Sequence, residues 1–381
     1  MISLAYRSIV LVFSTGLVSA QPAPRFHSDP GDVWKFNQTI FLPYTSQFSS
    51  SSTPSVHGSI NGHSFTFPVD SGSTGLMIGQ SLLPGLKLTS ENEGEYERGW
   101  EFLDSSSLLY TGRFVPLNVT FFGLVGSQAT SHVPVLVVQQ VLKCPGYNAT
   151  TGNGVCAQSV ESTASEKHVT YMGVGFGRNV AGSGISFGTP DHNPFLNIIA
   201  INKLKATHLR TGYSLSTQGV HLGLTSTNTR NAAWVPLSKG ATSDPRDWGE
   251  LDMSFTVNGV GNYHGKAIID TGIPQMFLQS APIATLPIVT IASGPSPLEH
   301  TRRVTNGTTL AFAFPNFEDG IAGYDFVVGD ENFPSQPEYI QPVTSGSGPF
   351  VNTGRKFLFG FTIVFDAIGG RFGFICLKCS S

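Results

Sequence analysis

Two short motifs carry the residue types that acid–base chemistry requires. The tripeptide Asp-Ser-Gly begins at Asp70 directly after the apolar run FPV, and the tripeptide Asp-Thr-Gly begins at Asp270 directly after the apolar run AII. A carboxylate at the inner end of a buried strand is unfavourable unless hydrogen-bond donors surround it or it has a function. Because the two motifs share the same context, one in each half of the chain, we predict that the two aspartates act together.

Such a pair has a defined chemistry. Two carboxyl groups within hydrogen-bonding distance share one proton, because two adjacent negative charges repel each other. At a given pH one member is then a base and the other an acid. The ionised carboxyl can take a proton from a water held between them, while the protonated carboxyl donates to the carbonyl oxygen of a peptide bond. Gly72 and Gly272 would let the backbone approach the pair closely. We expect no cofactor.

Composition predicts the fold class and excludes one class of partner. The chain has 381 residues, enough for two cores at ~100 to 200 residues per domain. Charged residues make up 12% and the net charge is -3, so no basic surface is available for nucleic acid. The chain contains 43 Gly, 24 Pro and 28 Phe, which favours short strands joined by turns. We therefore predict an all-β protein.

The first twenty residues have the layout of a cleavable secretory signal. A positive charge at Arg7 precedes the apolar run Ile9–Val18, and small residues lead to a cleavage site after Ala20. The apolar run is too short for a membrane span, so we expect a secreted protein without a membrane anchor. Four Asn-X-Ser/Thr sequons fit passage through a glycosylating route. They begin at Asn37, Asn118, Asn148 and Asn306.

Four cysteines in an oxidising compartment predict two disulfides. Cys144 and Cys156 bracket a loop rich in Gly, Asn and Thr, so their pairing would close a short surface excursion. Cys376 and Cys379 form a CxxC near the C-terminus, which is read either as a redox motif, as half a zinc site or as a small terminal disulfide. We favour the terminal disulfide, because no helix N-terminus or second ligand pair accompanies it.

Short alternating runs separated by Gly, Asn and Pro indicate antiparallel sheet from Val56 onward. A Ser-rich loop, Ser46–Ser55, should precede this region. One helix is predicted at Pro194–Leu204, with Pro at its first position and Asp191 or Asn193 as its cap. After this segment a second series of similar short strands follows, and it contains the second aspartate motif.

From about Val56 to Phe374 the sequence resembles the pepsin-like aspartic proteases. In that family each of two β lobes contributes one Asp-Thr/Ser-Gly loop. The runs YMGVGFG (171–177) and NTGRKFLFGFTIVFD (352–366) look like the segments that thread behind the two loops. The resemblance implies a bilobal fold of two β-barrel-like lobes with an interlobe cleft. The implied order is a signal (1–20), an N-terminal segment with the first strand (21–55), an N-terminal lobe (56–218) and a C-terminal lobe (219–381).

The resemblance also assigns roles around the two aspartates. It implies that the hydroxyls of Ser71 and Thr271 bond across the lobes, and that Ser73 supports Asp70. Ile273 stands where a hydroxyl residue commonly supports the second aspartate, so apolar surroundings should raise the apparent pKa of the pair. Arg355 stands where the family often has an acidic residue.

The hairpin that covers the site in this family, its flap, departs from the family pattern. The position of the usual flap tyrosine falls on Ser105, and Tyr110 is a nearby candidate on the other side of the hairpin tip. Met77 stands where a tryptophan usually bonds the flap tyrosine. Family zymogens carry a basic propeptide, yet Lys35 is the sole lysine between Gln21 and Asp70. We therefore expect the protein to be secreted already folded, with no propeptide covering its site.

Two function classes remain. The first is a secreted aspartic endopeptidase, active at acid pH as a monomer on an extended peptide or protein substrate. The second is a pepsin-fold protein without proteolytic activity, acting as a binder or as an acid–base catalyst on a small molecule. Other motifs are weaker. The GxSxG at Gly184–Gly188 lacks the strand–turn–helix order of a nucleophile elbow, and no ligand spacing among the 10 histidines indicates a metal site.

Overall fold

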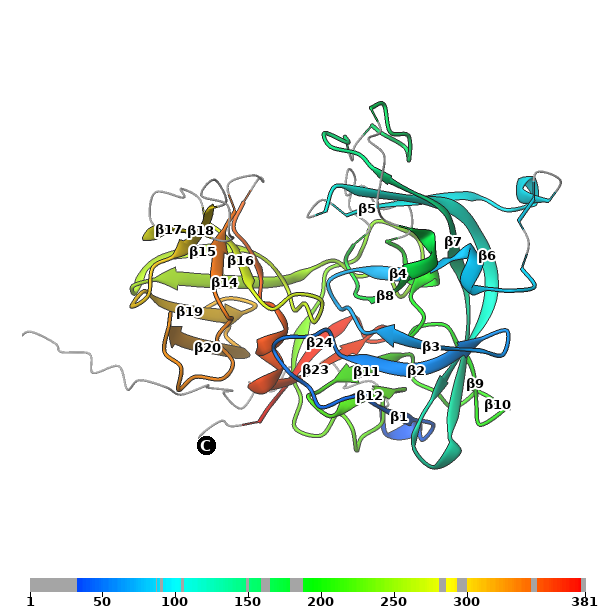
Figure 1. Cartoon of the computed structure of the whole chain (residues 1–381). Helices are drawn as coiled ribbons and strands as arrows, with labels where there is room; N and C mark the ends of the chain where they lie inside the picture. The colour runs from blue at the N-terminus through cyan, green and yellow to red at the C-terminus, as the bar shows by residue number, and fades with distance from the viewer. Residues whose placement is uncertain are drawn as a thin grey trace, which may run out of the picture.

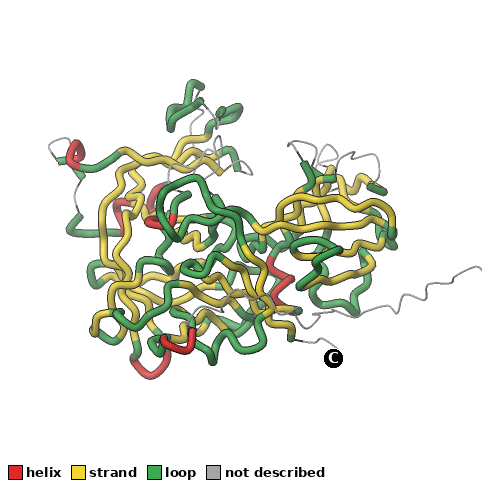
Figure 2. The backbone as a smooth tube through the Cα atoms, turned by 180° about the vertical axis from the view of Figure 1, so that it is seen from behind, coloured by secondary structure: helices red, strands yellow, loops and turns green. Residues whose placement is uncertain are grey.

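The computed structural model describes most of the chain after the first thirty-two residues. The described ranges are 33–86, 88–89, 92–103, 106–148, 151–158, 165–178, 188–280, 286–292, 300–343 and 348–377. Within them the fold is all-β, as predicted, and the sheets are strongly curled (Figure 1). The helical elements of the described ranges are short 3-10 turns, which Figure 2 shows as isolated red segments. These turns are η1 (Val33–Lys35), η2 (Gln80–Leu82), η3 (Glu93–Glu95), η4 (Leu124–Gly126), η5 (Glu166–His168), η6 (Pro190–His192) and η8 (Arg355–Phe359).

The first half of the chain forms most of a 9-stranded sheet, which carries the first aspartate motif. Its long strands β6 and β7 pair over their whole length and bend round the sheet (Figure 1). In chain order its strands are β2 (Ser55–Ile60), β3 (His63–Pro68), β4 (Thr74–Gly79), β5 (Arg98–Leu103), β6 (Leu108–Phe122), β7 (Gln128–Lys143), β8 (Thr170–Val174), β9 (Ile198–Ile201) and β10 (Leu204–Lys205).

A 7-stranded sheet carries the second aspartate motif. Its strands are β14 (Leu251–Val257), β15 (Val260–Ile268), β16 (Met276–Gln279), β19 (Thr309–Phe314), β20 (Ala322–Val327), β21 (Ile340–Pro342) and β22 (Phe350–Asn352). A separate two-stranded ribbon consists of β17 (Ile288–Ala292) and β18 (His300–Val304).

The third large sheet has 6 strands and is antiparallel throughout. It joins segments from both halves of the chain, and lies between the other two large sheets in Figure 1. Its strands are β1 (Ile40–Pro43), β11 (Gly212–Leu215), β12 (Gly219–Leu222), β13 (Ala233–Pro236), β23 (Phe361–Asp366) and β24 (Arg371–Cys376). The predicted boundary between residues 218 and 219 falls in the β11–β12 turn, so that hairpin spans the boundary within one sheet.

The two motifs occupy equivalent places in their sheets. Strand β3 ends two residues before Asp70, and strand β15 ends two residues before Asp270. The strand after each motif, β4 or β16, then pairs with one parallel and one antiparallel neighbour. Each aspartate is therefore delivered by a turn between two strands of a curled sheet.

The helix predicted at Pro194–Leu204 is wrong. This segment contains a turn followed by strands β9 and β10, and β9 pairs with β7. Asn193 does not cap a helix, because its amide donates to the carbonyls of Val174 and Gly175 while its Oδ1 accepts from the amide of Phe195. The β-branched residues that follow favour a strand, and the sheet edge provides its partner. The predicted Ser-rich loop Ser46–Ser55 lies between β1 and β2, except that Ser55 is already the first residue of β2.

Candidate active site

Asp70 and Asp270 lie against each other although 200 residues separate them. Both side chains are buried, with 8% and 6% of their surface exposed. A Cβ on Gly72 would lie 2.3 Å from Cγ of Asp270, and a Cβ on Gly272 would lie 2.6 Å from Oδ1 of Asp70. Each motif glycine therefore faces the carboxyl of the opposite motif, at a separation that excludes any side chain. The structure brings together the two aspartates that the sequence singled out.

Crosswise hydrogen bonds between the second residues of the motifs lock the two turns together. The hydroxyl of Ser71 accepts from the amide of Thr271 at 3.0 Å and donates to the carbonyl of Ile269 at 2.6 Å. The hydroxyl of Thr271 accepts from the amide of Ser71 at 3.0 Å and donates to the carbonyl of Val69 at 2.5 Å. Because the arrangement is reciprocal, neither turn can shift without breaking bonds in the other.

Three donors surround the carboxyl of Asp70. The amide of Gly72 donates to Oδ1 at 2.7 Å, and the hydroxyl of Ser73 donates to Oδ2 at 2.7 Å. The hydroxyl of Tyr171 also donates to Oδ2, at 2.6 Å, and lies 2.9 Å from the Ser73 hydroxyl. Burial, reinforced by the charge of Asp70, raises the pKa of Tyr171 well above its ordinary value, so this hydroxyl stays a donor. Ser73 has the position that the resemblance implied, whereas Tyr171 was not anticipated.

Asp270 has a different set of donors. The amide of Gly272 donates to Oδ1 at 2.6 Å, as its counterpart does for Asp70. The side-chain amide of Asn352, at the end of β22, donates to Oδ2 at 2.6 Å. Ile273 has no hydroxyl to offer, and Asn352 supplies a bond to the second aspartate from another strand. The sequence analysis did not anticipate this residue.

Tyr171 and Asn352 come from equivalent segments that pass behind the two turns. Each stands two residues before a glycine, Gly173 or Gly354, that the neighbouring chain crowds. A Cβ on Gly173 would lie 2.4 Å from the amide nitrogen of Thr74, and a Cβ on Gly354 would lie 2.3 Å from a backbone carbonyl. The sequence signal that could have found both donors is this repeated spacing to the threading glycines.

The two aspartates titrate as a linked pair. Burial raises the pKa of Asp270 to about 7, with the charge of Asp70 as the second cause. The donors Asn352 and Gly272 act in the opposite direction, because they stabilise the ionised form of Asp270. Asp270 therefore keeps its proton over the acid range, so its carboxyl is a hydrogen-bond donor beside Asp70.

Arg355 lies behind the second turn. Its Nη2 donates to the carbonyl of Gly272 at 2.6 Å and to the hydroxyl of Thr53 at 3.2 Å. Burial lowers the pKa of Arg355, while the charges of Asp270 and Asp70 oppose that effect. The arginine at this unusual place therefore ties the Asp270 turn to the loop before β2 and adds a positive charge near the pair.

A hairpin of β5 and β6 adjoins the first aspartate. Ser105, the predicted counterpart of the flap tyrosine, lies outside the described residues. Tyr110 is half-buried on β6, and with Met77 and Tyr171 it lines a cavity of about 240 Å³. The inner face of this hairpin therefore looks toward the residues that hold Asp70.

The hairpin also contributes an acidic residue that the sequence analysis missed. Glu101 on β5 is directly opposite Tyr110 on β6 and is 4% exposed. Its Oε2 is buried and has no hydrogen-bond partner within the described part of the chain. Burial raises the pKa of Glu101 to about 8, a shift that Arg178 reduces and Asp70 increases. No local motif marks this glutamate, because its burial depends on how the hairpin packs in the folded chain.

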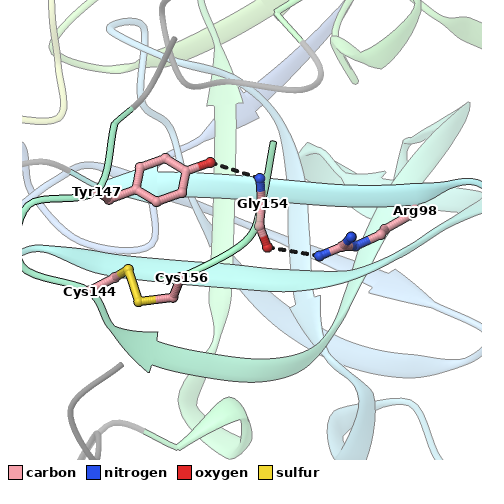
Figure 3. Close-up of a disulfide and its surroundings, with 5 residues drawn as sticks. All are labelled: Arg98, Cys144, Tyr147, Gly154 and Cys156. Carbon is pink, nitrogen blue, oxygen red and sulfur yellow. Dashed lines mark hydrogen bonds between the residues drawn. A yellow bond between two sulfur atoms is a disulfide. The ribbon is translucent and has the colours of Figure 1, made fainter. Parts of the chain in front are cut away.

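The disulfide between Cys144 and Cys156 is confirmed, and its loop packs on the hairpin (Figure 3). The hydroxyl of Tyr147 accepts from the amide of Gly154, and Arg98 on β5 donates to the carbonyl of Gly154 at 2.8 Å. The ring of Tyr147 also contacts Phe102, with centroids 4.6 Å apart. The loop therefore buttresses the side of the hairpin that faces away from Asp70. Cys376 ends β24, and Cys379 lies outside the described residues.

The remaining predicted sites have simple outcomes. The asparagines of the four sequons are all exposed, as glycan attachment requires: Asn37, Asn118, Asn148 and Asn306. The signal segment and the serine of the GxSxG lie outside the described residues. Within the described ranges there is no group of three acidic, His or Cys side chains able to hold a metal. No helix in that part of the structure is long and apolar enough to cross a membrane.

No protein-family model matches the chain, and no curated protein matches its sequence.

Proposed function

We propose that the protein is a secreted aspartic-type endopeptidase with the bilobal pepsin-like fold. The observation that carries the proposal is the pair of buried carboxyls, each facing the glycine of the other motif and fixed by reciprocal hydroxyl–amide bonds. A structural role alone gives no reason to bury two adjacent acids, because their mutual repulsion and desolvation oppose folding. Two equivalent turns in two curled sheets also support a duplicated, two-lobed architecture.

The proposed reaction uses only groups of the pair and one water. The ionised carboxyl takes a proton from a water held between the aspartates, and the resulting hydroxide attacks the carbonyl carbon of the scissile peptide bond. The protonated carboxyl donates its proton to the carbonyl oxygen, which forms a tetrahedral gem-diol. Proton transfer to the leaving nitrogen then allows the C–N bond to break, and the pair returns to its shared-proton state.

Secretion rests on separate observations. The N-terminal segment has the layout of a signal, the Cys144–Cys156 disulfide suits an oxidising compartment, and the sequon asparagines are exposed. The substrate that fits is an extended peptide or protein segment lying across the pair, bound by a monomer.

The test is proteolysis of casein by the purified protein between pH 3 and pH 5. We expect cleavage that a statine-type inhibitor blocks and that Asp70→Asn and Asp270→Asn each abolish. The matched control is Asp319→Asn, which changes an exposed aspartate distant in sequence from both motifs and should leave cleavage intact. Absence of inhibitor-sensitive cleavage in the wild-type protein would contradict the proposal.

One alternative is favoured by the unusual hairpin. Glu101 adds a buried acid whose Oε2 has no hydrogen-bond partner among the described residues, and the flap tyrosine position falls on Ser105. A pepsin-fold protein that binds a ligand, or performs acid–base chemistry on a small molecule, could retain both aspartates without cleaving peptides. Binding of the statine-type inhibitor with no cleavage of casein would favour this alternative.

A further inference from the structure

Glu101 lies on the inner face of the hairpin. Residues directly opposite in an antiparallel pair project to the same face, so Glu101 and Tyr110 share a face of the β5–β6 hairpin. Tyr110 and Tyr171 line the same cavity, and the Tyr171 hydroxyl donates to Asp70. The charge of Asp70 is in turn close enough to affect the ionisation of Glu101. The carboxyl of Glu101 is therefore part of the surroundings of the first aspartate.

The folded chain alone does not account for this residue. Glutamate is among the residues least often buried, and a buried polar group without a partner costs about 1–3 kcal/mol. Glu101 is 4% exposed, and its Oε2 has no partner among the described residues. Buried groups of this kind in native proteins often receive a partner from a ligand or serve a catalytic role.

We propose that the carboxyl of Glu101 binds the main chain of the peptide substrate, donating to a peptide carbonyl and accepting from a peptide N–H. This inference rests on the proposed function, and adds a substrate-binding group on the hairpin side of the aspartate pair. A neutral carboxyl has one donor and one acceptor side by side, which matches the two polar groups that an extended peptide presents. Because every peptide has these groups, the contact would be independent of substrate side chains.

Burial and the charge of Asp70 together outweigh Arg178 and keep Glu101 neutral, and four ionisable groups interact electrostatically with it. They are Asp70 from the motif turn, Tyr110 from β6, Tyr171 from β8 and Arg178 from the segment after β8. Burial and the charge of Asp70 raise the pKa of Glu101, Arg178 lowers it, and the result is about 8. The acid is thus a hydrogen-bond donor over the whole range in which the aspartate pair holds its proton.

Recognition of a cationic substrate side chain fits less well. It would require an ionised Glu101 at acid pH, and Arg178 would repel the incoming cation. Arg178 is already paired with Glu250 at 3.3 Å, so its charge stays in place beside the site. We therefore assign Glu101 to the peptide main chain, and loss of a preference for lysine or arginine in a Glu101 variant would overturn that assignment.

The experiment measures the dissociation constant of a statine-type peptide inhibitor at pH 5 for the full-length secreted protein. Glu101→Met keeps the size but removes both hydrogen-bonding groups, so binding should weaken roughly three- to tenfold. Glu101→Gln keeps a donor and an acceptor and should weaken binding less than Glu101→Met does. Glu97→Gln, an exposed glutamate next to the same hairpin strand, is the matched control and should bind as the wild type does.

A second measurement separates binding from a structural role. The ratio of the wild-type dissociation constant to that of Glu101→Gln should stay constant at acid pH and rise above about pH 8, because only the wild-type side chain ionises. A ratio that is flat from pH 5 to pH 9 overturns the inference, as does unchanged affinity in a folded Glu101→Met protein. Absence of inhibitor binding by the wild type overturns it too.

Failure of this inference and failure of the proposed function are distinguishable. Casein cleavage abolished by Asp70→Asn, together with inhibitor affinity independent of Glu101, would contradict the Glu101 inference alone. Inhibitor affinity that depends on Glu101, without casein cleavage at any pH, would contradict the endopeptidase proposal and keep the peptide-binding role.

Discussion

Tyr171 and Asn352 donate hydrogen bonds of 2.6 Å to Oδ2 of Asp70 and of Asp270, from equivalent positions of two threading segments. The two aspartates thus have equivalent surroundings, but the side chains that donate to them differ chemically. A phenol supports the first and an amide supports the second. Because the donors differ, the two halves of the pair can be altered separately, and their contributions can be measured separately.

Removal of the Asn352 amide should move the upper limb of the pH–activity profile to higher pH. Asn352 stabilises the ionised form of Asp270 and so opposes the effects of burial and of the Asp70 charge. Asn352→Leu removes this opposition and should raise the pKa of Asp270 further. The loss of one bond to a charged group corresponds to roughly one pKa unit. The check is kcat/KM from pH 3 to pH 8, and a limb that moves to lower pH would contradict the assignment.

Substitution of the crosswise threonine should destabilise the fold. Thr271→Val preserves shape but leaves the amide of Ser71 and the carbonyl of Val69 without their buried partner. We expect a loss of about 2–3 kcal/mol in the free energy of unfolding and a large loss of activity. Urea unfolding measures the first quantity, and Thr309→Val, on an exposed position of β19, is the control.

The contributions of Ser71 and Thr271 to the free energy of unfolding should be coupled. In a double-mutant cycle, Ser71→Ala and Thr271→Val should together destabilise the protein less than the sum of the single changes, because the two hydroxyls lie 3.2 Å apart and loss of either one loosens the turn that holds the other. Strict additivity of the two free-energy changes would mean that the two turns are held independently.

The protein should be more stable in acid than near neutrality. The folded pKa of Asp270 is raised from 3.8 to about 7 and that of Glu101 from 4.5 to about 8. For a carboxyl whose folded pKa is raised, the stabilisation is complete below the unfolded pKa and is lost as the pH rises through the folded pKa. We therefore expect Tm to fall between about pH 4 and pH 8, as followed by calorimetry. Glu101→Gln should flatten part of this slope, and an unchanged slope would contradict the shift.

Removal of the disulfide should loosen the hairpin. The cross-link joins residues with a sequence separation of 12, and such a loop is expected to contribute about 2–3 kcal/mol. In Cys144→Ser/Cys156→Ser the Gly154 contacts with Tyr147 and Arg98 lose their support, so limited proteolysis should cut the 144–156 loop faster. Inhibitor affinity should fall with it, since the outer face of the hairpin is no longer buttressed. Equal cleavage rates for both proteins would show that the loop holds its place without the cross-link.

The motif turns could be predicted from the sequence because their information is local. In an Asp-(Ser/Thr)-Gly turn after an apolar strand, the positions of the carboxyl, the hydroxyl and the glycine relative to one another are set by three consecutive residues. The same motif occurs twice. The segments that pass behind the turns could be identified from the resemblance, but Tyr171 and Asn352 were missed because the sequence does not show which side chain of each segment reaches the carboxyl. Glu101 was missed because its burial depends on how the β5–β6 hairpin packs in the folded chain, which no local motif shows. The helix at Pro194–Leu204 was wrongly predicted because the sheet edge at β7 outweighed local helix signals.

The six-stranded sheet constrains when the fold can be completed during synthesis. Strands β23 and β24 complete that sheet from the last described segment of the chain, and Asn352 precedes them by only a few residues. A nascent chain that stops before β23 lacks two strands of that sheet. The sheet joins segments from both halves of the chain, so it can close only after β24 has been synthesised.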